Sequence, residues 1–270
     1  MILAPQSRTA FSLVELSIVL VIVGLLAGGI LSGQSLIRAA ELRSLTTDSA
    51  RYQAAVYTFR DKYFALPGDM PNATQFWNVL ADDGISAKCQ NTEATGKPTC
   101  NGNGDGLIAS TAVAESERFR AWQHLANAGL VEGSYTGRTD SSTPGSFVTK
   151  AGKNVPATKL AGTHMRFVGI PATTGTDDPL LFSGVSAGNY IEVRHDSDAA
   201  AAAAPPAPLT AQEAWNIDTK LDDGKPGLGQ IFTHKYSSTA YPKCATTDDP
   251  ATALYNVGDG SKLCVYDIGF

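Results

Sequence analysis

The sequence is poor in the residues from which metal centres are commonly built. It has only four cysteines and four histidines in 270 residues, and no two cysteines form a CxxC pair. A zinc ribbon requires such pairs, so the spacing argues against one. The histidines are scattered without metal-ligand spacing, and they are His124, His164, His195 and His234. We therefore interpret them as core or surface residues.

Basic residues are also in short supply. The chain has 21 lysines and arginines against 26 acidic residues, which gives a net charge of -5. A nucleic-acid-binding surface usually shows a basic stripe, so this balance weighs against one.

Residues 184–188 read GVSAG and match G-x-S-x-G, but a nucleophile elbow needs a helix after the serine, and here a strand pattern follows. With no catalytic constellation, we expect no enzyme activity.

Charge is missing altogether from residues 16–37. About 20 apolar helical residues span the roughly 30 Å hydrocarbon layer of a membrane. A secretory signal peptide has a shorter apolar region followed by a cleavage site, whereas helix-forming sequence continues here without a break. Residues 11–37 are therefore predicted to be the transmembrane half of a long helix. Glu15 lies inside this stretch, and a charge in lipid is costly enough to mark a functional residue whose partner should be found.

The charges that flank the apolar stretch disagree about its orientation. Arg8 precedes it, and by the positive-inside rule this places the N-terminus in the cytoplasm. Arg38, Arg43 and Arg51 lie on the other flank and favour the opposite orientation. Both orientations stay open on charge alone.

The helix is expected to continue as an amphipathic segment over residues 38–66. Apolar residues recur there in alternating steps of three and four, which places them on one helix face. They are Leu42, Leu45, Tyr52, Val56, Phe59 and Tyr63. The sequence LPGD at residues 66–69 ends the helix, because Pro67 cannot continue the hydrogen-bond ladder and Gly68 favours a turn.

Residues 67–270 are predicted to form one globular domain of short elements. A short helix is expected at residues 115–127, and a capping box of Thr210 and Glu213 begins another that runs to about residue 221. Strands are expected at THMRFVGI, PLLFSG, NYIEVRH, QIFTHKY and KLCVYDIGF. The predicted fold is therefore α+β, with the long N-terminal helix packed on an antiparallel sheet.

The four cysteines fall into two neighbouring pairs, and each pair brackets a loop. An even number of cysteines in an exported chain indicates two disulfides. Three connectivities are open, and we prefer Cys89–Cys100 with Cys244–Cys264. Four free thiols are the alternative.

The sequence NGNGDG after Cys100 is similar to the first half of an EF-hand calcium loop. Its oxygen-bearing side chains are Asn101, Asn103 and Asp105. The twelfth position of that motif holds Ala112 in place of the bidentate glutamate, although Asp222 and Asp223 could add ligands. The loop is either a calcium site or a Gly/Asn turn that a disulfide closes.

The residues around Glu15 resemble the N-terminus of the type IV pilin and type II secretion pseudopilin family. Its subunits begin with a short leader, followed by Phe and by an apolar helix with Glu as the fifth mature residue. Residues 10–28, AFSLVELSIVLVIVGLLAG, match this pattern if cleavage falls between Ala10 and Phe11. One departure is Ala10, because the family usually has Gly before the cut.

The resemblance implies a sequence of processing and assembly. A prepilin peptidase would remove leader residues 1–10 and expose the amine of Phe11, which is usually methylated. In a fibre, Glu15 of one subunit would neutralise that amine on a neighbour. The resemblance also implies a single-pass subunit of the bacterial inner membrane with a periplasmic domain. An assembly platform would add it, with other subunits, to a type IV pilus or type II secretion pseudopilus.

Two other hypotheses stay open from the sequence. One is a single-pass, membrane-anchored periplasmic binding protein that never polymerises. The other is an anchored enzyme, for which no catalytic residues stand out. No cofactor is expected beyond the candidate calcium ion. Processing at Ala10 separates the fibre subunit from both alternatives.

Overall fold

A computed structural model of the chain describes residues 12–81, 84, 89, 92–108, 117–140, 148–171, 182, 185–195, 207–234 and 244–270. The chain divides into two compact units, Met1–Arg43 and Ser44–Phe270. The boundary falls inside the first helix, six residues beyond the predicted end of the membrane half at residue 37. Ala10 and Phe11 lie outside the described residues.

The N-terminal helix α1 (Leu13–Tyr63) is 51 residues long. Its buried residues all lie in its C-terminal part, and they are Leu45, Ser49, Tyr52, Ala55, Val56 and Phe59. The predicted apolar face is therefore the face that packs, with Leu42 and Tyr63 half-buried at its two ends. Amphipathic spacing alone was enough to identify it.

The helix ends at Tyr63, before the predicted end at residue 66. Phe64 takes a left-handed conformation with φ of 55°, which stops the helical ladder three residues early. The turn that follows brings the Gly68 N–H to within 3.0 Å of Nδ1 of His124. The helix therefore ends ahead of the proline that marks its end in the sequence.

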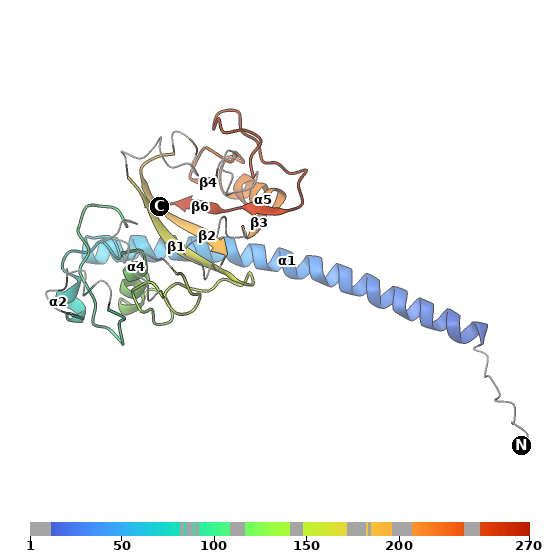
Figure 1. The fold of residues 1–270 in the computed structure, drawn as a ribbon, viewed down its shortest axis with the longest axis horizontal. Helices are drawn as coiled ribbons and strands as arrows, with labels where there is room; N and C mark the ends of the chain where they lie inside the picture. The colour runs from blue at the N-terminus through green and yellow to red at the C-terminus, as the bar shows by residue number, and fades with distance from the viewer. Residues whose placement is uncertain are drawn as a thin grey trace, which may run out of the picture. The chain divides into compact units, whose positions relative to one another are not determined.

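The main sheet has four strands in the order β1-β2-β6-β4, and all neighbours are antiparallel (Figure 1). The strands are β1 (Thr163–Ile170), β2 (Gly188–His195), β6 (Tyr266–Gly269) and β4 (Ile231–Thr233). A second sheet pairs β3 (Leu209–Thr210) with β5 (Lys262–Cys264). The α+β fold with a long N-terminal helix and an antiparallel sheet is confirmed.

The predicted last strand at residues 262–270 is two strands. It is interrupted at Val265, where the chain leaves the two-stranded sheet as β5 and enters the main sheet as β6. The sequence pattern there is continuous, so only the pairing partners reveal the break. The predicted strand PLLFSG falls largely outside the described residues.

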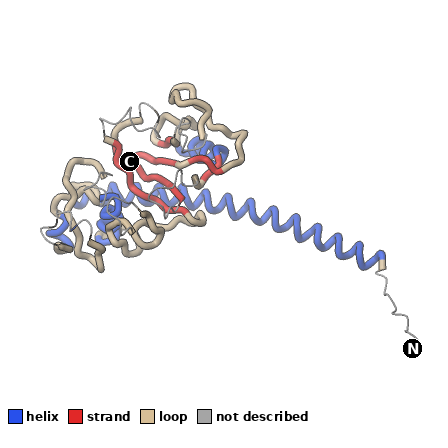
Figure 2. Tube along the Cα trace, in the orientation of Figure 1, coloured by secondary structure: helices blue, strands red, loops and turns tan. Residues whose placement is uncertain are grey.

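Three short helices complete the described elements: α2 (Ala73–Trp77), α4 (Glu117–Asn127) and α5 (Ala211–Leu221). The predicted capping box of α5 is present, because Thr210 Oγ1 accepts from the Glu213 N–H and Glu213 Oε2 accepts from the Thr210 N–H. Loops surround these elements, most visibly in the tan segments between α2 and β1 (Figure 2).

Aromatic side chains join α1, α4 and β1 into the core of the second unit. The Tyr52 ring meets Trp122 edge-on at 4.9 Å, and Trp122 lies 4.4 Å from Phe167 of β1. Phe59 stacks on His124 at 6.3 Å between ring centroids. Each such pair adds about 0.5–1.5 kcal/mol to the burial of the rings.

Helix α4 fixes the surrounding loops through buried polar side chains. Arg120 is fully buried and donates to the carbonyls of Cys89 and Thr92, at 2.9 and 2.8 Å. Gln123 donates to the Pro98 carbonyl at 2.8 Å. Burial lowers the pKa of Arg120 to about 9. These bonds tie the loop that carries the first cysteine pair to the core.

Candidate functional site

The apolar half of α1 is the most exposed hydrophobic surface of the described chain. α1 is long and apolar enough to cross a membrane, and its apolar stretch has no part buried within the protein. Leu25 and Leu31, for example, are 72% and 68% exposed. A contiguous apolar surface of this size marks a membrane-contacting or protein-contacting site.

Glu15 has a partner inside its own helix end. Oε2 of Glu15 accepts a hydrogen bond of 2.9 Å from the Ser12 N–H, and the Ser12 hydroxyl accepts from the Val14 N–H at 3.3 Å. This arrangement is close to a capping box, in which the side chains at the two ends of the first turn satisfy free backbone N–H groups. The carboxylate also complements the positive end of the helix dipole.

The capping bond engages only one oxygen of the Glu15 carboxylate. Among the residues that the structure describes, no donor reaches Oε1, and the side chain is exposed. The acid can therefore hold the helix end and accept a second, external cation at the same time. The Ser-x-x-Glu pattern before an apolar run is a known helix-start signal, so this cap could have been predicted from the sequence.

Both preferred cysteine pairs are joined in the structure. Cys89 and Cys100 form one disulfide, with Cα atoms 5.9 Å apart, and Cys244 and Cys264 form the other, with Cα atoms 5.0 Å apart. No cysteine is free. Cys264 lies at the end of β5, so the second disulfide ties the residue 244 loop to the smaller sheet.

The side-chain oxygens of the candidate calcium loop already accept hydrogen bonds from backbone N–H groups of the protein. Oδ1 of Asn101 accepts from the Thr74 N–H, Oδ1 of Asn103 from the Asp105 N–H, and Oδ1 of Asp105 from the Leu107 N–H.

The same loop closes around a protein carboxylate. The backbone N–H groups of Gly104, Asp105 and Gly106 all donate to Asp69, at 2.7–3.0 Å. The Asp69 carboxylate is thus the anion around which the backbone of the loop is organised. Ala112 lies outside the described residues, and calcium binding at Asn101, Asn103 and Asp105 stays a prediction.

The histidines and the G-x-S-x-G segment are placed as follows. His124 and His164 are buried, in α4 and β1, and His195 ends β2 half-buried. β2 begins at Gly188, so a strand follows Ser186, as the sequence indicated. His234 differs from the other three, because it belongs to a group of buried charged side chains.

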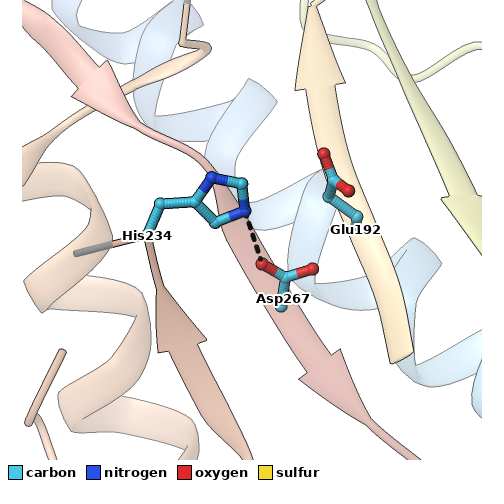
Figure 3. Close-up of side chains that lie close together, drawn as sticks. All are labelled: Glu192, His234 and Asp267. Carbon is cyan, nitrogen blue, oxygen red and sulfur yellow. Dashed lines mark ion pairs between the residues drawn. The ribbon is translucent and has the colours of Figure 1, made fainter. Parts of the chain in front are cut away.

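This group, which we call the cross-sheet cluster, consists of Glu192, His234 and Asp267 (Figure 3). Glu192 on β2 and Asp267 on β6 are direct register partners, and His234 follows β4. All three are buried, and their ligand-type atoms lie within 4.8 Å of one another. Figure 3 shows the His234 ring directed at the Asp267 carboxylate, and Nε2 and Oδ2 are 3.5 Å apart.

Two arginines neutralise one of the two acids. Arg166, the β1 register partner of Glu192, donates to its Oε2 from Nε and Nη2 at 3.0 and 2.7 Å, and Arg194 donates to Oε1 at 2.9 Å. Burial alone would raise the pKa of Glu192, but Arg166 and Arg194 hold it well below its usual range. Burial raises the pKa of Asp267, which has neither arginine as a hydrogen-bond partner among the described residues.

A second acidic group lies where α5 ends. Asp218, Asp222 and Asp223 place carboxylate oxygens within 4.8 Å of one another. Asp222 accepts from the Ile231 N–H at 2.9 Å, and Asp218 accepts from the Tyr255 hydroxyl at 2.8 Å. Burial raises the pKa of Asp218 to about 6. These bonds fix the turn between α5 and β4.

Comparison of the chain with family models, with curated proteins and with solved structures finds no match.

The cross-sheet cluster could not be assembled from the sequence, because its members are far apart along the chain. A weak signal was available in the strand NYIEVRH, where Glu192 stands between Ile191 and Val193. An acid in the middle of an apolar strand requires a buried partner.

Proposed function

We propose that this chain is a prepilin-like structural subunit, which a prepilin peptidase processes and which assembles into a type IV pilus or type II secretion pseudopilus. The observation that carries the proposal is the position of Glu15. A carboxylate with one unengaged oxygen stands at the start of an apolar helix that the protein itself leaves exposed. Such a helix requires lipid or the helices of other subunits around it.

The chemistry of assembly follows from that position. Removal of residues 1–10 would create an α-amine at residue 11, four residues before Glu15, which lies in the first turn of α1. Packing of helices would bury the amine and the carboxylate together, which is tolerable only if the charges pair. Glu15 of one subunit therefore receives the Phe11 amine of a neighbour. The inner membrane stores the subunit before an assembly platform adds it.

Processing is the first test of this proposal. Full-length protein from a host that has the peptidase should lose ten residues, and the new N-terminus should carry a methyl group. Intact-mass analysis and N-terminal sequencing measure both changes. A mature protein that retains Arg8 would contradict the proposal and would favour the membrane-anchored binding protein that never polymerises.

A matched variant shows whether the small residue before the cut is recognised. Ala10→Gly introduces the residue that type IV pilins and pseudopilins usually have before the cut, and this variant should be cleaved at least as fast as the wild type. Ala10→Leu places a large side chain at the same position and should block cleavage while leaving membrane insertion intact. Equal cleavage of the two variants would show that the peptidase does not read this position.

A further inference from the structure

The cross-sheet cluster of Glu192, His234 and Asp267 has no part in the proposed assembly through α1. We propose that it is a binding site for a divalent transition-metal ion, for which Zn²⁺ is the probe. The inference rests on the geometry, burial and donor chemistry of the three side chains, and it stands or falls independently of the proposed function.

The spacing of the donor atoms fits an ion better than a direct hydrogen bond. His234 Nε2 and Asp267 Oδ2 are 3.5 Å apart, which exceeds the 2.7–2.9 Å typical of a charge-assisted hydrogen bond. Two ligands on one Zn²⁺ ion, with bonds of 2.0–2.2 Å at the tetrahedral angle, are separated by roughly 3.3 Å. All three donors lie within 4.8 Å of one another, so one ion can reach them with small side-chain movements.

One buried carboxylate oxygen of the cluster is held only by a long ion pair. Oδ2 of Asp267 belongs to a residue that is only 3% exposed, and its partner among the described residues is the His234 ring at 3.5 Å, with which it forms an ion pair but no hydrogen bond. Buried carboxylate oxygens are normally hydrogen-bonded, because desolvation without a partner is costly. The oxygen is directed toward His234, which is the arrangement that a bridging metal would satisfy (Figure 3).

The donor types select the class of metal. One imidazole nitrogen with two carboxylate oxygens suits Zn²⁺, Fe²⁺ and Mn²⁺, whereas Ca²⁺ and Mg²⁺ prefer oxygen ligands alone. A three-ligand set leaves a fourth position for water in a tetrahedral site.

The arginines determine how tightly the ion is held. Glu192 accepts three hydrogen bonds from Arg166 and Arg194, two on Oε2 and one on Oε1, so Oε1 keeps a lone pair for a metal. Two guanidinium groups beside a divalent ion repel it. Removal of one of these positive charges should therefore strengthen metal binding. A purely structural ion-pair network gives no reason for such a gain.

Equilibrium dialysis of the full chain in detergent, followed by metal analysis, tests the site. The wild type should retain one Zn²⁺ per chain after EDTA treatment and reloading with ZnCl₂, and its thermal midpoint should rise with added Zn²⁺. His234→Gln and Asp267→Asn should each weaken binding by at least about tenfold. Arg194→Gln should strengthen it several-fold. His195→Gln, which removes a histidine outside the cluster, should bind like the wild type.

A spectroscopic measurement covers the case in which a variant does not fold. Wild-type protein loaded with Co²⁺ should show the intense visible absorption of a four-coordinate ion, which Zn²⁺ should displace. Either of two results would overturn the proposal. The first is wild-type protein that takes up no Zn²⁺ beyond the level of folded His234→Gln or Asp267→Asn. The second is a Co²⁺ spectrum identical to that of the hydrated ion in detergent buffer.

Discussion

At the scale of single residues, Glu15 has one role that the structure shows and a second, separable role that we propose. The structure shows that Glu15 caps the start of α1 through the Ser12 N–H. The proposed assembly into a fibre would give it a second role, in which the same acid pairs with a neighbour's amine. Charge is needed only for the second role, because a glutamine at this position also completes a capping box. This difference allows the two roles to be tested apart.

His124 should make the protein sensitive to acid. Burial lowers its pKa to about 3, whereas the unfolded chain has the ordinary value of about 6.5. Between these values the unfolded state binds a proton that the folded state excludes, so stability is lost as pH falls below about 6.5. The loss between pH 7 and pH 5 should be about 2 kcal/mol.

Urea denaturation of the full chain in detergent at the two pH values checks this. His124→Gln should be less stable than the wild type at pH 7, because the bonds to Gly68 and Thr99 are disturbed. The gap between the two proteins should narrow by about 2 kcal/mol at pH 5. A gap that is equal at both pH values would show that His124 is not the acid-sensitive group.

At the scale of elements, the start of α5 depends on one hydroxyl. Thr210→Ala removes the acceptor for the Glu213 N–H and should cost about 1 kcal/mol of stability. Thr219→Ala makes the same chemical change at an exposed position inside the same helix, and it should be neutral or slightly stabilising because alanine favours helices. Thermal denaturation of both variants measures the difference, and equal losses would contradict the capping role.

The two disulfides should differ in their contribution. Replacement of Cys244 and Cys264 by serine opens a loop of 20 residues and should cost about 3 kcal/mol. The shorter 11-residue loop between Cys89 and Cys100 is worth only about 0.5 kcal/mol less on chain entropy. Hydrogen bonds from Arg120 still hold that loop after its disulfide is lost. The variant that lacks Cys89 and Cys100 should therefore be more stable in urea than the variant that lacks Cys244 and Cys264.

At the scale of the whole molecule, local sequence patterns predicted the helices and strands but not the contacts between distant elements. The apolar face of α1 and the cap of α5 follow from residues close in sequence, and both are present. The division of the last strand at Val265 follows from distant pairing partners, which no local pattern contains. The cross-sheet cluster is of the second kind, because register across β2, β6 and β4 builds it.

The most direct test of the account measures which Glu15 variants enter fibres. Membrane and sheared-fibre fractions are compared for the wild type, Glu15→Leu and Glu15→Gln, with Glu15→Asp as the variant that keeps the charge. We predict that Leu and Gln variants are inserted and cleaved but fail to enter fibres, because the neighbour's amine would be buried unpaired at several kcal/mol. The Asp variant should be intermediate. Glu15→Gln in fibres at the wild-type level would contradict the account, since the cap alone would then explain the acid.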